Sequence, residues 1–237
     1  GIGPGKKPDM THRAYEAMKN SDIIVGYKTY VDLVKEYFED KKLVNSAMKK
    51  EVDRCIDVLE LAKEGNIVSL ISSGDSGVYG MAGIMLEIAD EDIEIEVIPG
   101  VTASNAAGAF VGAPIMHDHV TISLSDLLTD WNLIKKRLEL AAQGDFVISL
   151  YNPKSKGRIS QIVEARDIML KHKPAATKVA IVKNVGRKDQ SYTLTTLDEM
   201  LNHEIDMLTI VIIGNSNTFI KNGKMITPRG YGDKYNY

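Results

Sequence analysis

The 237-residue sequence predicts an α/β protein of two domains, in which short apolar strands alternate with helices. Two observations support this class. Short aliphatic and β-branched runs are repeatedly followed by small-residue loops and amphipathic patterns, which is typical of strand–loop–helix units. The pattern is interrupted over Gly112 to Asp126 and then starts again. We therefore expect an N-terminal domain over residues 1–113 with a mainly parallel sheet, and a C-terminal domain over residues 114–237 with a mixed sheet.

The chain opens on a glycine-rich stretch, GIGPG at residues 1–5, of the type that normally follows a strand. No strand residues precede it. Either a first strand is missing or the chain begins on a frayed loop, and both alternatives stay open. Thr11 is a suitable N-cap for a helix that places Ala14, Ala17 and Met18 on one face.

The remaining elements of the N-terminal domain follow from periodicity and glycine positions. They are strands over Asp22–Tyr27, Ile67–Ile71 and Glu94–Ile98, and helices over Tyr30–Phe38, Lys49–Glu64, Met81–Ala89 and Asn105–Val111. Gly65 is a suitable C-terminal glycine for the helix that precedes it. The strand at 67–71 has the composition of a strand that is buried on both faces, as in a parallel sheet.

The same patterns predict the C-terminal domain. Its elements are a short strand through Thr121, Ile122 and Leu124, a helix over Asp130–Gln143, a helix that follows Arg158 and runs to about Lys171, and strands over Phe146–Leu150, Lys178–Lys183 and Met207–Ile213. Asn222-Gly223, between two apolar pairs, predicts a type I′ hairpin.

Two loops have the composition of ligand-binding junctions. Gly74, Gly77 and Gly80 follow the strand at 67–71, with Asp75 directly after the first glycine, and PGVTAS follows the next strand. Ligands of open α/β sheets bind beyond the carboxyl ends of strands, where glycine lets backbone N–H groups come close. Three glycines alone slightly favour a plain tight turn without a ligand. The second junction and GIGPG favour a ligand site.

Bulk properties exclude several classes of protein. The net charge of −3 disfavours a general nucleic-acid binder, and no apolar run approaches the roughly 20 residues that span a bilayer. Cys55 is the one cysteine, which rules out an internal disulfide and fits a reducing cytoplasm. We expect a cytoplasmic protein with neither a membrane nor a nucleic acid as partner.

Seven motifs together resemble a known family. GIGPG (1–5), SGDSGVYG (73–80), IPGVTAS (98–104) and GAPIMHD (112–118) resemble the tetrapyrrole methyltransferases of cobalamin and sirohaem synthesis. SLSDLL (123–128), LYNPKSKGR (150–158) and NVGRKDQ (184–190) make the chain most similar to the precorrin-3B or cobalt-factor III C-17 methyltransferases. The resemblance covers nearly the whole chain. Ser76 departs from it, because the family more often has proline there.

The resemblance implies an enzyme that binds S-adenosylmethionine in the cleft between two domains and releases S-adenosylhomocysteine. It would methylate carbon 17 of a polycarboxylated tetrapyrrole, with ring contraction, and would be a homodimer. The residues that the resemblance assigns to the donor side are Pro4, Ser73, Gly74, Asp75, Val78, Thr102, Ala103, Tyr151, Asn152 and Val185. Within this set, Pro4 would close the tetrapyrrole side of the cleft. Whether the substrate is metal-free or carries cobalt stays open.

Ring contraction moves protons, so a general acid or base is expected. His117 and Asp118 are our candidates, and a polar linker without catalytic duty is an equal alternative. Lys154, Lys156 and Arg158 would bind substrate carboxylates, although a charge run is also typical of a solvated face. No further His or Cys has the spacing of a metal ligand, so we expect no metal site.

Two alternatives to this function remain. One is a related methyltransferase that acts on another ring carbon or on a protein side chain. The other is a non-catalytic module that binds a tetrapyrrole or a nucleotide, because a fold alone does not establish a function.

Overall fold

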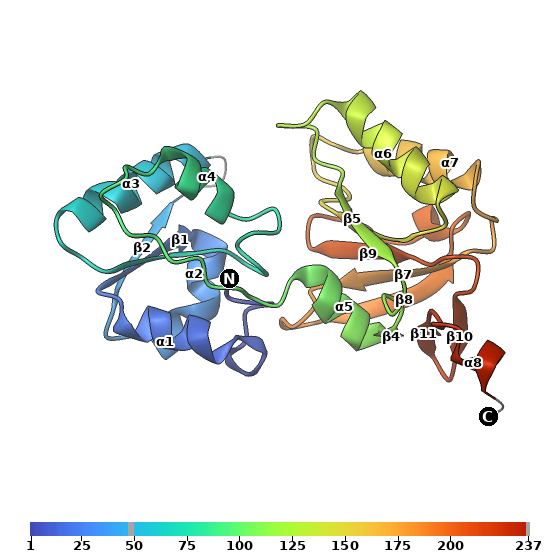
Figure 1. Cartoon of the computed structure of the whole chain (residues 1–237), viewed down its shortest axis with the longest axis horizontal. Helices are drawn as coiled ribbons and strands as arrows, with labels where there is room; N and C mark the ends of the chain where they lie inside the picture. Colours follow the sequence, from blue (N-terminus) through green and yellow to red (C-terminus); the bar gives the residue numbers. More distant parts are fainter. Residues whose placement is uncertain (47–49, 236–237) are drawn as a thin grey trace. The chain divides into compact units, whose positions relative to one another are not determined.

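The computed structural model describes residues 1–46 and 50–235, and the chain divides into two compact units, Gly1–Ala103 and Ser104–Tyr237. Both units combine helices with a β-sheet, which confirms the predicted α/β class (Figure 1). The division of the chain into domains at residues 113 and 114 stays a prediction. Every helix in the described residues is too short or too polar to cross a lipid bilayer.

The first unit is built from parallel strands and the helices that connect them. Its elements are α1 (His12–Asn20), β1 (Ile23–Tyr27), α2 (Lys28–Val34), β2 (Lys42–Ser46), α3 (Glu51–Lys63), β3 (Val68–Ile71) and α4 (Ala82–Ile88), with 3-10 turns at Lys7–Asp9 and Lys35–Tyr37. The Thr11 hydroxyl accepts a hydrogen bond from the Ala14 N–H, so the predicted N-cap is confirmed.

The strands of this unit have the order β2-β1-β3 within the described residues, and both pairs are parallel. Successive side chains of β1 point to opposite faces: Ile24 packs with α1 and α2, whereas Ile23 and Val25 pack with α3 and α4. Figure 1 shows α3 and α4 over one face of these strands and α1 on the other. Cys55 is buried in the cluster under α3 and α4, as expected for a structural thiol.

Three expectations for this unit need correction or completion. The predicted strand at Glu94–Ile98 is wrong, because this segment pairs with no described strand. The observed strand β2 was not predicted, because KLVNS has too few apolar residues to show a strand pattern. The predicted helix start at Lys49 lies outside the described residues, and α3 is observed from Glu51.

The second unit contains a mixed sheet of order β5-β6-β9-β7-β8. Its elements are α5 (Ala103–Val111, which begins at the unit boundary), β4 (Gly112–Ala113), β5 (His119–Ser123), α6 (Trp131–Gln143), β6 (Val147–Tyr151), α7 (Gln161–Leu170), β7 (Lys178–Lys183), β8 (Ser191–Thr196), a 3-10 turn (Met200–Asn202), β9 (Thr209–Ile213), β10 (Phe219–Lys221), β11 (Lys224–Ile226) and α8 (Tyr231–Lys234). The pair β5–β6 is parallel, and β9 is antiparallel to both β6 and β7.

The core of the second unit lies between this sheet and the helices α6 and α7, which cover one face of it (Figure 1). Asp130 caps α6 by accepting hydrogen bonds from the N–H groups of Asn132 and Leu133. The predicted hairpin is confirmed, since Asn222 and Gly223 join the antiparallel strands β10 and β11 with φ angles of 52° and 70°. Positive φ at both turn residues is the geometry of a type I′ turn.

Candidate active site

Three loops of the first unit meet beyond the carboxyl end of its sheet. Gly3 donates a hydrogen bond to the carbonyl of Gly74 (3.0 Å) and Gly74 donates one back to Gly3 (2.8 Å). The amino group of Gly1 donates to the carbonyl of Ile98 (2.8 Å). These contacts join residues 1–5, the loop after β3 and the segment before α5. The three glycine-containing motifs that the sequence singled out therefore form one site.

Asp75 connects two of these loops through its carboxylate. One oxygen accepts a hydrogen bond from the Gly77 N–H and the other accepts one from the Gly100 N–H, both at 2.8 Å. The side chain thus fixes its own turn and the start of PGVTAS at the same time. In this geometry Asp75 fixes the backbone of both loops.

Glycine is required at the centre of the site. Gly74 has a φ angle of 69°, and a Cβ atom there would occupy the space beside the Thr102 Cα and the Ala103 N, 3.6 Å from each. A Cβ atom at Gly80 would lie 2.6 Å from the Ser76 carbonyl oxygen. The loops therefore form a close-packed backbone cradle, which suits an amino-acid-like ligand held by peptide groups.

The predicted donor residues of the first unit lie in these three loops, and the last of them is the first residue of α5: Pro4, Ser73, Gly74, Asp75, Val78, Thr102 and Ala103. Sequence reasoning missed Tyr79, whose side chain is half exposed and whose φ angle is 54°. An aromatic residue in the left-handed region is uncommon, and such residues cluster at functional sites. No sequence signal marks it, because the strain comes from the loop and not from the residue type.

In the second unit, the loops after β5, β6 and β7 lie at the same end of the sheet, beyond the carboxyl ends of these three strands. This follows from the pairing, because β7 and β6 are both antiparallel to β9 and thus run in the same direction. Asn152 donates from Nδ2 to the Ser123 hydroxyl at 3.0 Å. Three motifs therefore lie at this end of the sheet: SLSDLL, LYNPKSKGR with Asn152, and NVGRKDQ with Val185.

Tyr151 stands at the end of β6 and is buried. Its hydroxyl accepts a hydrogen bond from the Ser104 N–H at 2.8 Å, at the start of α5. The first N–H groups of a helix have no partner within the helix, so this hydroxyl satisfies one of them. Tyr151 thus fixes the start of α5, the helix that follows Thr102.

The basic loop contains residues in two different settings. Arg158 turns inward: its Nη2 donates to the Asn152 carbonyl at 2.9 Å and lies 3.7 Å from the sulfur of Met207. Lys154 is half-buried and Lys156 is exposed. The two lysines remain as candidate substrate ligands, whereas Arg158 supports the backbone that carries Asn152.

The predicted catalytic pair, His117 and Asp118, lies at the opposite end of the second sheet, beside the amino ends of β5 and β6. Asp118 directly precedes β5, and its carbonyl accepts a hydrogen bond from the Val147 N–H at the start of β6 (3.2 Å). The His117 Nδ1 and an Asp118 carboxylate oxygen are 3.7 Å apart, and Asp118 is largely exposed. Strands of five residues, about 15 Å, separate this pair from the loop with Asn152. The structure does not bring these two groups together, and the catalytic assignment stays a prediction.

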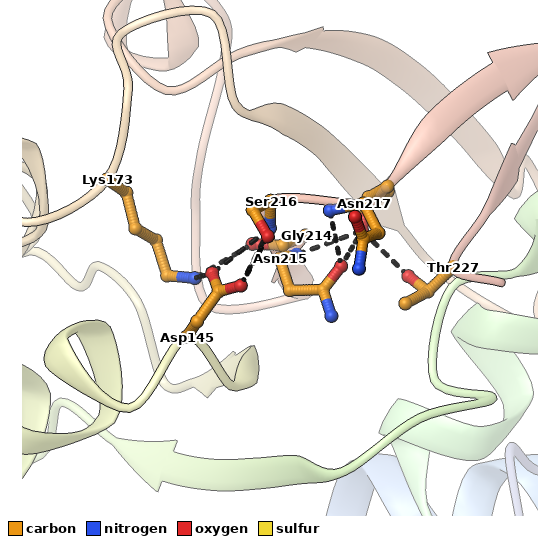
Figure 2. A network of polar contacts seen from close by, with 8 residues as sticks. Asp145, Lys173, Gly214, Asn215, Ser216, Asn217 and Thr227 are labelled. Atoms are coloured by element: carbon orange, nitrogen blue, oxygen red, sulfur yellow. Dashed lines mark hydrogen bonds and ion pairs between the residues drawn. The ribbon is translucent and has the colours of Figure 1, made fainter. Parts of the chain in front are cut away.

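A second polar network that the sequence did not suggest surrounds Lys173, whose side chain is 1% exposed. Its ammonium donates to an Asp145 carboxylate oxygen (3.1 Å) and to the Gly214 carbonyl (3.2 Å), and Ser216 donates to Asp145 through both N–H and hydroxyl (Figure 2). Burial lowers the pKa of Lys173, partly offset by Asp145. The network joins the turn before β6, the segment after α7 and the end of β9. Its role is structural.

Comparison with known proteins gives consistent matches. The family model "Tetrapyrrole (Corrin/Porphyrin) Methylases" matches residues 1–201. A cobalt-factor III methyltransferase of Priestia megaterium is 49% identical over 242 residues, covering 99% of this chain; the chain spans 45% of that longer protein. A probable cobalt-factor III C(17)-methyltransferase of Salmonella typhimurium is 49% identical over 234 residues, covering 98% of this chain and 97% of that protein.

The structural comparison agrees with the fold. The crystal structure of the methyltransferase CobJ superimposes with a TM-score of 0.91 at 34% sequence identity, covering 96% of this chain and 97% of that one. This likeness confirms the predicted fold class over nearly the full length.

Proposed function

This chain belongs to the tetrapyrrole (corrin/porphyrin) methylase family, and from that premise we propose that it transfers a methyl group from S-adenosylmethionine to carbon 17 of a cobalt-factor III or precorrin-3B type tetrapyrrole in cobalamin biosynthesis. The observation that carries the choice of carbon 17 is the 49% identity, over nearly the full length of both chains, to the Salmonella relative. Both relatives at this identity are named for cobalt-factor III, which favours the cobalt-containing substrate.

The site of the first unit fits the donor. A methyl sulfonium loses a neutral thioether on transfer, so the step needs no acid to help departure, and positioning provides most of the catalysis. The cradle around Gly74 offers backbone groups and small side chains of this kind. We propose that Gly74, Val78, Thr102 and Ala103 hold the amino-acid part of the donor, while Asp75 keeps the two loops in register.

Residues of the second unit complete the proposal. Tyr151, Asn152 and Val185 would hold the adenosine, with Tyr151 acting through its aromatic ring because its hydroxyl is engaged by Ser104. Lys154 and Lys156 would attract the substrate carboxylates. We also propose a homodimer, which light scattering on the purified protein tests directly.

The experiment that tests this function uses S-adenosylmethionine with a ¹³C-labelled methyl group. The chain is incubated with cobalt-factor III and, separately, with precorrin-3B, and the product is examined by mass spectrometry, absorption and carbon NMR. We expect one labelled methyl group at carbon 17 and faster turnover of the cobalt form. Label at another ring carbon would support the related-methyltransferase alternative, and binding without transfer in single-turnover conditions would support a binding module.

A further inference from the structure

The segment at residues 204–208 directly precedes β9, the central strand of the second sheet. Because β9 is antiparallel to both β6 and β7, it begins where these two strands end. Lys183, the last residue of β7, is paired with Thr209, the first residue of β9. The segment therefore lies between the loop after β6 and the loop after β7, which contain Asn152 and Val185.

Asp206 folds this segment into a turn. One of its carboxylate oxygens accepts hydrogen bonds from the Leu208 N–H (2.8 Å) and from the Thr209 hydroxyl (3.0 Å), and the Thr209 N–H donates to the Asp206 carbonyl (3.3 Å). An aspartate side chain that binds the N–H two residues further on forms an Asx-turn, which fixes the local backbone. The position of Leu208 therefore depends on Asp206.

The other carboxylate oxygen of Asp206 holds the turn against β7. It lies 2.8 Å from the Lys183 ammonium nitrogen, and the two side chains are 35% and 28% exposed, so water screens this pair only in part. The hydrogen bond with Asp206, followed by the one with Glu204, raises the pKa of Lys183, so the ammonium stays charged at neutral pH. A charged contact thus attaches the turn before β9 to the end of β7.

The turn also contacts both neighbouring loops. The Leu208 carbonyl accepts a hydrogen bond from the Asn184 N–H (3.0 Å), at the start of the loop after β7. The Met207 sulfur lies 3.7 Å from the Arg158 Nη2, and the same Nη2 donates to the Asn152 carbonyl (2.9 Å) in the loop after β6. A movement of the turn would therefore displace the two loops together.

Asn152 and Asn184 are the positions at which these loops begin. Each is the first residue after its strand, and each has a left-handed backbone, with φ angles of 49° and 53°. Asparagine tolerates this region better than most residues do, yet a left-handed residue keeps its conformation only where surrounding contacts fix it. The turn at Asp206 supplies such contacts to both positions.

We propose that Asp206 is a positioning residue of the donor site, which contacts no ligand itself and fixes the loops of Asn152 and Val185 through the turn at residues 206–209. Lys183 assists by holding this turn on β7. The inference rests on the proposed function, because it takes these two loops to hold the adenosine. A donor that meets ordered loops loses less free energy on binding, so the contribution is preorganisation.

Titration calorimetry with S-adenosylhomocysteine and matched variants tests the proposal. Asp206→Ala removes the contacts that form the turn and hold it on β7. Glu204→Gln is the control, because it removes the charge of the other partner of the same ammonium at a side chain that is 77% exposed. We expect Asp206→Ala to bind at least fivefold more weakly than the wild type and Glu204→Gln to bind within twofold of it. Asp206→Asn keeps an acceptor for the Leu208 N–H, so its affinity should lie between those of the wild type and Asp206→Ala.

Kinetics and amide exchange separate positioning from a purely structural role. Well below the unfolding midpoint of Asp206→Ala, we expect its Michaelis constant for S-adenosylmethionine to rise at least fivefold, with a smaller change in kcat and a Michaelis constant for the tetrapyrrole within twofold. Amide exchange at residues 184–187 should become faster. A lower unfolding midpoint with unchanged donor affinity would overturn the proposal.

A second pair of variants covers the case in which Asp206→Ala does not fold. Lys183→Met only loosens the turn from β7 and should weaken the binding of S-adenosylhomocysteine at least threefold, whereas Lys183→Arg keeps the charge and should bind within twofold of the wild type. Equal affinity in the two Lys183 variants would then overturn the proposal. A wild type that does not bind S-adenosylhomocysteine contradicts the proposed function and this inference together, whereas normal binding by both wild type and Asp206→Ala contradicts this inference alone.

Discussion

At the scale of single residues, Asp75 shows how a side chain can serve a ligand site through the backbone. Both of its carboxylate oxygens are engaged by N–H groups of two different loops. Its removal leaves both donors without this partner: the exposed Gly77 N–H can bind water, whereas the part-buried Gly100 N–H cannot do so fully, and a buried unsatisfied donor costs about 1–3 kcal/mol. The loops can avoid part of that cost by moving apart, which disturbs the donor site.

We predict that Asp75→Ala weakens the binding of S-adenosylhomocysteine at least tenfold, which corresponds to about 1.4 kcal/mol. Titration calorimetry measures this change directly. Asp75→Asn keeps one acceptor oxygen, so its affinity for S-adenosylhomocysteine should lie between that of the wild type and that of Asp75→Ala. Asp53→Ala, at an exposed aspartate of α3, is the control and should bind normally. A folded Asp75→Ala protein with unchanged affinity would exclude Asp75 from the site.

The residues of this site could be predicted in part. Glycines after a buried strand indicate a ligand loop, and the structure brings Gly3, Gly74 and Gly100 together. The contact of Arg158 with Met207 and the hydroxyl contact of Tyr151 with Ser104 could not be predicted, because each joins residues that are more than 40 positions apart in the sequence. His117 and Asp118 were chosen from residue type, which does not tell at which end of the strands a residue lies.

At the scale of elements, strand assignment depended on whether a segment finds a partner. β2 has the polar sequence KLVNS and becomes a strand because the edge of β1 is available to it. Glu94–Ile98 has a clear alternating pattern and pairs with no described strand, because a pocket lined by residues 67–71 and 93–98 lies between it and β3. Pattern describes which faces a segment can bury, whereas pairing depends on neighbours that the local sequence does not specify.

The Lys173 network is an element-scale connection, since it joins the end of α7 to the turns that flank β6 and β9. Asp145→Asn leaves Lys173 buried without its counter-charge, and asparagine tolerates the φ angle of 52° at this position. Because Asp145 is 44% exposed, solvent screens the pair, so we expect a loss of about 1–3 kcal/mol in unfolding free energy. Asp167→Asn, at an exposed pair with Arg166, should cost under about 1 kcal/mol.

The pH dependence of that loss has a defined sign. Burial raises the pKa of Asp145, but hydrogen bonds from Ser216 and Lys173 outweigh burial and hold the pKa below its ordinary value. A lowered carboxyl pKa contributes stability above the unfolded value of about 3.9 and loses it as pH falls through the folded pKa. Denaturant titrations should therefore show a constant difference between wild type and Asp145→Asn near neutrality that shrinks below about pH 4. A difference that persists at pH 2 would contradict the ion pair.

At the scale of the whole molecule, a protein of net charge −3 is proposed to bind a substrate with several carboxylates. Long-range attraction must then come from a local basic region, and the loop after β6 is our candidate. Arg158 supports Asn152 and is left unchanged in the test. Lys154 and Lys156 can be removed without disturbing a hydrogen bond that fixes the loop.

We predict that Lys154→Ala with Lys156→Ala raises the Michaelis constant for the tetrapyrrole several-fold and flattens its dependence on salt, because salt screens the attraction that the change removes. Donor affinity should stay within twofold. The double change Lys135→Ala and Lys136→Ala on α6 removes the same charge from one half-buried and one exposed lysine, and is the control. The test is steady-state kinetics over a range of salt concentrations. If the Michaelis constant depends on salt equally in both double variants, Lys154 and Lys156 belong to a solvated face.

The bond between Gly1 and Ile98 spans 97 positions of the chain, and this has a consequence for synthesis on the ribosome. At roughly 5–20 residues per second, about 5–20 s pass between the emergence of the first loop and the emergence of its last partner. Throughout that interval the nascent chain exposes GIGPG without the segment around Ile98 that bonds to it. Chains arrested before residue 98 should therefore be cleaved rapidly by a protease at the loop after β3, and chains arrested well beyond Ala103 should resist it. The loops of the candidate site are thus the last part of the first unit to mature during translation.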